Sequence, residues 1–166
     1  MTIRPARASD WDQMWPIFHA VVSTGTTYVF APDTTKEDAR PYFLGPDIAS
    51  WVAEEDGCIV GMYKLVPNRP GLGSHVANAS FMVDPRHHGR HIGEGLGRHC
   101  LREAKRAGYL AMQFNFVVGT NTGAVALWRK LGFEVVGTLP KAFQHRDHGL
   151  VDAYVMYRFL DDIILD

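Results

Sequence analysis

Hydrophobic residues along the chain follow two spacings, one typical of strands and the other of helices. Apolar or alternating runs predict strands over 2–6, 49–54, 58–67, 76–83, 111–118, 134–139 and 150–159. Apolar residues three or four positions apart predict helices that begin near Asp10, Thr35, Ile92 and Thr122. The order βαα-ββ-β-α-β-α-ββ mixes hairpins with crossover units, so the predicted fold class is α+β (mixed α/β).

Prolines and polar residues interrupt this pattern at defined places. Pro16 lies inside the first helical pattern and should kink that helix or delay its start. The segment 25–32 is expected to be a loop that carries two aromatic residues, Tyr28 and Phe30. We expect 141–149 to be a polar, histidine-bearing loop between the last two strands. The pattern assigns no structure to the amphipathic tail, 160–166.

The segment 76–108 has the clearest organisation in the chain. An apolar strand ends at Pro85, which has no amide hydrogen for a ladder, and a basic turn with several glycines follows. Ile92, Leu96 and Cys100 then mark one face of a helix that ends at Gly108. A turn of this kind exposes backbone N–H groups at the positive end of a helix dipole, so it predicts a phosphate or pyrophosphate site.

Composition limits the class of protein without identifying it. The 166 residues are 46% hydrophobic and 21% charged, with a net charge of −1, as expected of a single globular domain over 1–166. Neither a signal peptide nor a membrane-spanning run is expected, and the charge balance does not suggest a nucleic-acid or membrane partner. Cys58 and Cys100 are expected to be reduced core residues, which favours the cytoplasm.

The spacing of the glycine turn bears on three alternatives, a dinucleotide-binding fingerprint, a Walker loop and a metal site. Gly93, Gly95 and Gly97 do not match a dinucleotide-binding fingerprint, and no Gly-Lys-Ser/Thr sequence of a Walker loop is present. His87, His88 and His91 lie close together, but no cysteine or acidic cluster joins them at zinc-like spacing. We therefore expect no metal site.

Two motifs resemble signatures of the GCN5-related N-acetyltransferase (GNAT) family. Residues 83–96, VDPRHHGRHIGEGL, are similar to its acyl-CoA signature V-x-P-x-x-R-G-x-G-I-G-x-x-L. Asn121, Ala124, Trp128, Gly132 and Phe133 fit a second pattern, N-x-x-A-x-x-x-Y-x-x-x-G-F. The resemblance implies a central mixed, mostly antiparallel sheet with splayed central strands, and the transfer of an acetyl group from acetyl-CoA to an amine.

The resemblance also implies which residues hold the cofactor. The pyrophosphate is expected on the turn, and the acyl carbonyl beside the preceding strand, whose backbone N–H would stabilise an oxyanion. The expected acetyl-CoA residues are Phe81, Met82, Val83, His88, Gly89, Arg90, His91, Ile92, Gly93, Glu94, Asn121, Ala124 and Trp128.

The sequence departs from the family pattern at three positions. His88 replaces the usual Arg or Gln, and His91 replaces a Gly, at a cost of about 1 kcal/mol if that position needs a positive φ. Trp128 stands where the family often has a tyrosine that is a proposed acid for the CoA thiolate, a role that an indole cannot fill. Either another group protonates the sulfur, or the thiolate leaves without an acid.

Two asparagines in the middle of apolar strands are the candidate acceptor residues. Asn is disfavoured in strands and costs free energy when it is buried without partners. Asn78 and Asn115 therefore have either a structural role or a role in binding and catalysis. Short motifs such as 75–79 and 114–118 resemble the GNAT branch that acetylates the proline analogue L-azetidine-2-carboxylate in fungi, which implies that both amides line the acceptor pocket.

Further acceptor residues are expected at Tyr28, Phe30 and Tyr154. The acceptor is expected to be a small-molecule amine, an amino acid or proline-like analogue, and no carboxylate stands out as its general base. The alternative is a non-catalytic acyl-CoA-binding or regulatory module on the same fold. By the resemblance, we also expect a homodimer.

Overall fold

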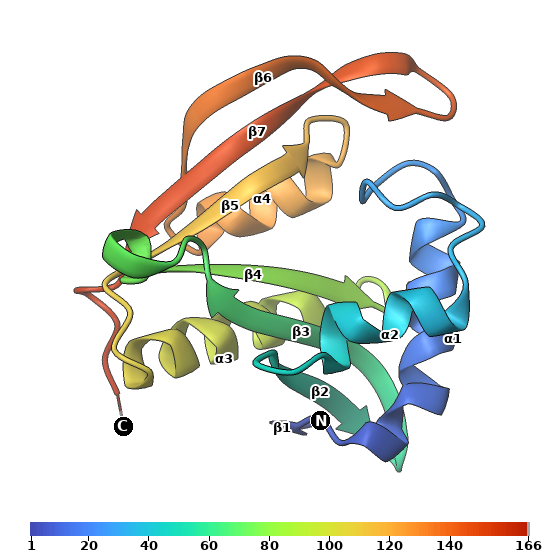
Figure 1. Ribbon diagram of the computed structural model, residues 1–166, viewed down its shortest axis with the longest axis horizontal. Coiled ribbons are helices and arrows are strands. Elements are labelled where there is room, and N and C mark those ends of the chain that lie inside the picture. The colour runs from blue at the N-terminus through green and yellow to red at the C-terminus, as the bar shows by residue number, and fades with distance from the viewer. Residues whose placement is uncertain (166) are drawn as a thin grey trace.

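The computed structural model describes residues 1–165, in which the elements follow the predicted order (Figure 1). They are β1 (Thr2–Pro5), α1 (Trp11–Val22), α2 (Lys36–Leu44), β2 (Ala49–Glu55), β3 (Cys58–Pro67), β4 (Val76–Val83), α3 (Ile92–Arg106), β5 (Ala111–Val118), α4 (Thr122–Lys130), β6 (Glu134–His145) and β7 (Gly149–Phe159). No helix within residues 1–165 has both the length and the apolar character needed to cross a membrane.

One sheet runs through the molecule in the order β1-β2-β3-β4-β5-β7-β6. β4 and β5 pair in parallel, whereas the other neighbouring strands within 1–165 pair antiparallel. In Figure 1, β4 and β5 start together at the left and separate towards the right. The mixed sheet with splayed central strands predicted from the sequence is therefore confirmed.

Helices cover the two faces of this sheet in pairs. Met62 of β3 and Met82 of β4 pack with α1 and α2 in one buried cluster. The neighbouring residue Tyr63 points to the opposite face, where a second cluster includes side chains of α3 and α4. The run 58–67 is apolar almost throughout because helices bury both faces of β3.

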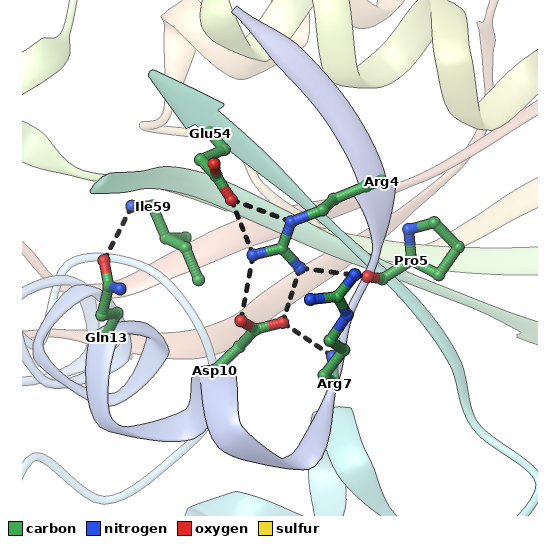
Figure 2. A network of polar contacts seen from close by, with 7 residues as sticks. All are labelled: Arg4, Pro5, Arg7, Asp10, Gln13, Glu54 and Ile59. Carbon is green, nitrogen blue, oxygen red and sulfur yellow. Dashed lines mark hydrogen bonds and ion pairs between the residues drawn. The ribbon is translucent and has the colours of Figure 1, made fainter. Parts of the chain in front are cut away.

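The N-terminal strand is fastened to the first helix by a charged network (Figure 2). The Arg4 guanidinium lies between two carboxylates, donating to Asp10 at 2.8 and 3.0 Å and to Glu54 at 2.8 Å. Asp10 also accepts the backbone N–H of Arg7 at 2.7 Å. Because Arg4 donates to its carboxylate, the pKa of Asp10 is lowered. This network joins β1, the start of α1 and β2.

Three expectations from the sequence prove wrong in detail. The polar loop expected at 141–149 is mostly strand, since β6 continues to His145 through a register shift between Leu139 and Phe143. The irregular pairing there breaks the alternation of apolar and polar residues, so the sequence pattern does not reveal this part of the strand. Cys58 is free but exposed, because it follows a tight turn at the outer end of β3, whereas Cys100 is free and buried. Pro16 does not delay the helix, because α1 begins at Trp11 and continues through the proline, whereas the kink predicted there stays a prediction.

Candidate active site

A cavity opens where the two parallel strands separate. β4 and β5 are paired at Val76 with Ala111 and at Ala77 with Met112, and the described pairing ends there. The cavity beyond has a volume of about 290 Å³. It is lined by Thr27, Tyr28, Val29, Tyr42, Asn78, Ala79, Ser80, Phe81, Phe114, Asn115, Phe116, Val117, Val118, Asn121, Ala124 and Trp128.

Asn78 occupies the point at which the strands part. Its side-chain Nδ2 donates to the backbone carbonyl of Gln113 on β5 at 2.9 Å. This bond satisfies a carbonyl that has lost its strand partner, which is the structural role weighed for Asn78 from the sequence. The amide oxygen of Asn78 takes no part in that bond, so the residue can be structural and still present an acceptor atom to the cavity.

Alternate backbone N–H and C=O groups of β4 point into the gap between β4 and β5. Asp84 N–H donates to Val60 on the β3 side at 2.9 Å, and Val76 C=O accepts from Asn68 on that side at 2.8 Å. Peptide groups alternate along a strand, so those of Phe81 and Val83 face the other way, towards β5. The Phe81 carbonyl already accepts the hydroxyl of Tyr28 at 2.5 Å. The N–H groups on this side are suitably directed to bind a carbonyl oxygen.

One wall of the cavity carries hydroxyl and amide groups. The Tyr42 hydroxyl and the Ser80 hydroxyl are 2.6 Å apart. Asn115 donates to the side chain of Asn68 at 2.7 Å and accepts from Gln113 at 2.8 Å. These bonds fix the orientation of the wall's polar groups before any ligand binds.

The opposite wall is aromatic and apolar. Trp128 packs on Phe81 and Phe114, with ring centroids 4.8 and 4.7 Å apart. Asn121 caps α4 by accepting the N–H of Ala124 at 3.3 Å, a common role for an asparagine at the start of a helix. At Gly97 an added Cβ would lie only 2.6 Å from Leu131, so this glycine allows α3 to approach α4 closely.

The turn between β4 and α3 is strained at His91, the position where the family pattern has a glycine. His91 has φ 59° and ψ 16°, in the left-handed region that favours glycine, and Gly89 has φ 78°. The first helical bond of α3 runs from Gly95 N–H to His91 C=O, which leaves the N–H groups of Ile92, Gly93 and Glu94 without intrahelical partners.

Charged side chains around this turn are paired with one another. Arg90 contacts Glu55 at 2.8 Å, and Arg86 contacts the buried Asp84 at 2.7 Å. Glu94 contacts Arg98 at 2.8 Å and Lys130 at 2.7 Å, and these cations lower its pKa to about 2. The backbone N–H groups, rather than free arginines, are therefore the main anion-binding feature of the turn.

The cavity itself is formed by uncharged residues. Of the residues that the structure describes, none that lines the cavity is Asp, Glu, His, Lys or Arg. Burial raises the pKa of the Tyr28 and Tyr42 hydroxyls, so both are protonated at neutral pH. A charged group lies against one lining residue, since Nζ of Lys64 on β3 is 3.3 Å from the centroid of the Tyr42 ring.

The structure brings some of the predicted residues together and leaves others apart. The predicted residues that line the cavity are Tyr28, Asn78, Phe81, Asn115, Asn121, Ala124 and Trp128. Phe30 lines an adjacent groove beside the β6–β7 hairpin instead. Met82 is buried under α1, and Tyr154 packs against the core around α3 and α4 without lining the cavity.

Sequence reasoning missed Tyr42, Ser80 and Lys64. The first two carry no signal, since a tyrosine in a short helix and a serine in a strand are both ordinary. Lys64 interrupts the apolar run 58–67, as Asn78 interrupts 76–83, and that polarity mismatch could have identified it.

Comparison with known proteins agrees with this geometry. The sequence model of the acetyltransferase (GNAT) family matches residues 11–133. N-acetyltransferase aca1 of Schizosaccharomyces pombe is 30% identical over 156 residues, which cover 83% of this chain and 75% of that protein. A GCN5-related N-acetyltransferase from Kribbella flavida is 45% identical, with a TM-score of 0.90 over 95% of this chain and 96% of the other.

A more distant structure shares the fold. The acetyltransferase yncA of Salmonella typhimurium, solved with acetyl-CoA, has a TM-score of 0.83 at 23% identity, over 99% of this chain and 96% of the other. The family match covers the split strands, the glycine turn and α4. The chain belongs to the acetyltransferase (GNAT) family and is an acyl-CoA-dependent N-acyltransferase.

Proposed function

We propose that the protein transfers an acetyl group from acetyl-CoA directly to the amine of a small molecule, an amino acid or a proline-like analogue. The observation that carries this proposal is the cavity at the β4–β5 split, which has an aromatic wall, a polar wall and free backbone groups between them. A volume of about 290 Å³ suits a small acceptor beside an acyl group, at the lower end of ordinary ligand sites.

The residues present fit acetyl-CoA. The unpaired N–H groups of Ile92, Gly93 and Glu94 would hold its pyrophosphate, and the gap-facing peptide groups of β4 would hold the pantetheine arm. Ala124 and Trp128 would cover the arm from α4. The bound cofactor supplies the acetyl group as a thioester.

The chain's own contribution to the chemistry is positioning and polarisation. The N–H groups of Phe81 and Val83 face the gap, where they would stabilise negative charge on an acyl oxygen. Asn78 and Asn115 would orient the acceptor from the polar wall. With no ionisable base in the cavity lining described, desolvation of the amine would favour its neutral, reactive form.

A sulfur acid is not required by this scheme. Trp128 is buried among Phe81 and Phe114 and supplies no acidic proton. A thiolate is a fair leaving group, since a free thiol has a pKa of about 8.5. The Tyr28 hydroxyl, which donates to the Phe81 carbonyl and lines the cavity, is the candidate proton donor in a scheme that uses one.

The finer assignment is to small cyclic secondary amino acids. It is supported by the small cavity and by the amide groups of Asn78 and Asn115, in the motifs that resemble the azetidine-2-carboxylate branch.

We also propose that the protein is a cytoplasmic homodimer. The dimer rests on the family resemblance, and the cytoplasmic location rests on the two free cysteines. Sedimentation equilibrium would test the dimer.

Kinetics of two variants test the assignment of the acceptor site. Asn78→Ala and Asn115→Ala should each lower kcat/KM for an accepted amino acid by about tenfold or more, while binding of acetyl-CoA persists. Gln13→Ala is the control, because it removes an amide side chain that bonds the Ile59 N–H and does not line the cavity. If both cavity variants keep the kcat/KM of the wild type, the acceptor-site assignment is wrong.

A further inference from the structure

A buried lysine without a counter-ion lies directly behind the polar wall of the cavity. Lys64 is 9% exposed, and it forms no ion pair with any carboxylate among residues 1–165. Its Nζ lies 3.3 Å from the centroid of the Tyr42 ring. An aromatic face offsets only part of the cost of taking an ammonium group out of water. Natural proteins rarely bury lysine without a paired charge.

The lysine nonetheless carries its charge under ordinary conditions. Burial lowers the pKa of Lys64 to about 8, so most of the protein holds a protonated ammonium group at pH 7. The fold therefore accepts a destabilising cation at this position. A functional reason for keeping it is expected where a ligand can supply the missing negative charge.

Two of the residues next to Lys64 line the cavity. Ser80 is its cross-strand partner in the β3–β4 register, and Tyr42 lies against its ammonium group. The Ser80 and Tyr42 hydroxyls are bonded to each other and line the cavity. The described cavity lining carries no charge of its own, so no charged lining residue offsets the positive electrostatic potential of Lys64 in the cavity.

We propose that Lys64 makes this cavity selective for acceptors that carry an anionic group beside the amine, such as a free α-amino acid. This inference rests on the proposed function and narrows its substrate class. An uncompensated cation attracts a carboxylate and repels a second cation, so amino acids bind, whereas polyamines and peptide amides are disfavoured. Lys64 is a specificity-determining residue that acts through space, with Tyr42 and Ser80 between it and the ligand.

A purely structural role for Lys64 makes a different prediction. If the lysine only packs on Tyr42, its removal should affect charged and neutral acceptors equally. The informative quantity is therefore the ratio of kcat/KM for an amino acid to that for its carboxamide. Comparing this ratio between variants cancels the different basicity of the two amines.

The experiment measures kcat and KM at pH 7 with saturating acetyl-CoA, for L-proline against L-prolinamide and L-alanine against L-alaninamide. In Lys64→Met the carboxylate-to-amide ratio should fall about tenfold, mainly through KM, whereas Lys64→Arg should retain it. Lys36→Met is the control, since it removes the same charge from an exposed pair with Asp12. An unchanged ratio in Lys64→Met would overturn the inference.

A second measurement needs only the wild type, in case the variants fail to fold. Cyclopentanecarboxylate should inhibit about tenfold more strongly than cyclopentanecarboxamide, and equal inhibition would overturn the inference. The two proposals fail differently. If no amine is acetylated, the proposed function is wrong, whereas acetylation of acids and amides with equal efficiency contradicts only the role of Lys64.

Discussion

The side chain of Asn78 donates to the carbonyl of Gln113 at 2.9 Å, one residue beyond the last backbone pair between β4 and β5. A side-chain amide thus closes the parallel ladder at the apex of the cleft. An apolar residue at this position would leave the Gln113 carbonyl without its partner. The cleft and one of its polar groups therefore depend on the same residue.

Replacing Asn78 should destabilise the protein, whereas replacing Asn115 should not. Asn78→Ala removes a half-buried bond and should lower the free energy of unfolding by about 1 kcal/mol. Asn115→Ala removes only exposed side-chain bonds, so its stability should match the wild type. Urea unfolding at pH 7 measures both. Equal stability of the two variants would contradict the role of Asn78 in closing the ladder.

Relief of strain at the turn should stabilise the protein. His91 adopts φ 59°, so His91→Gly should raise the free energy of unfolding by about 0.5–1 kcal/mol. His88 has φ −60° and ψ 152°, which any residue adopts, so His88→Gly should give no such gain. Thermal unfolding of both variants and the wild type, without ligand, measures these differences in stability. A gain in both variants, or in neither, would show that backbone strain at His91 is not the cause.

Much of the fold follows from local patterns, and much of the site does not. The element order was predictable because each helix and strand depends on neighbouring residues in the chain. The left-handed conformation of His91 could be suspected only because the family pattern has a glycine there. Tyr42 and Ser80 come together from α2 and β4, 38 positions apart. No local pattern predicts that contact, and none shows that Lys64 lies behind it.

The β6–β7 hairpin is another region where local sequence patterns do not predict the structure. Lys141, with φ 53°, and the shift between Leu139 and Phe143 break the alternation on which a strand prediction depends. Pairing with β7 holds the chain extended to His145 in spite of this break. Here tertiary contacts override the local signal.

The buried charge of Lys64 should appear in the pH dependence of stability. Its pKa falls from 10.5 to about 8 on folding, so between these values the unfolded chain binds more protons and stability rises with pH. The difference in unfolding free energy, wild type minus Lys64→Met, should increase from pH 8 to pH 10 by at most about 3 kcal/mol. Tyr28 and Tyr42 titrate in both proteins, so the difference removes their contribution. A flat difference in guanidinium unfolding would mean that Lys64 is not desolvated.

Breaking the N-terminal network should destabilise the protein at neutral pH. Arg4→Met leaves the carboxylate of Asp10, whose side chain is 9% exposed, without its cation and should cost about 2 kcal/mol. Because the folded pKa of Asp10 is lowered, this contribution is present above pH 3.8 and is lost as the pH falls below it. Chemical unfolding at pH 7 and pH 3 should show the gap between the two proteins closing. Lys36→Met, which breaks an exposed pair, should have no measurable effect at either pH.

The most direct test of the central claim follows both products of one reaction. The protein is incubated with saturating acetyl-CoA and a panel of amino acids that includes proline analogues, and mass spectrometry quantifies the acceptor and free CoA. We predict that at least one amine gains a single acetyl group, with one CoA released for each acetylated molecule and none above background without protein. Clear binding of acetyl-CoA with no acetylated amine and no CoA release across the panel would contradict the account, and would instead identify a non-catalytic acyl-CoA-binding module.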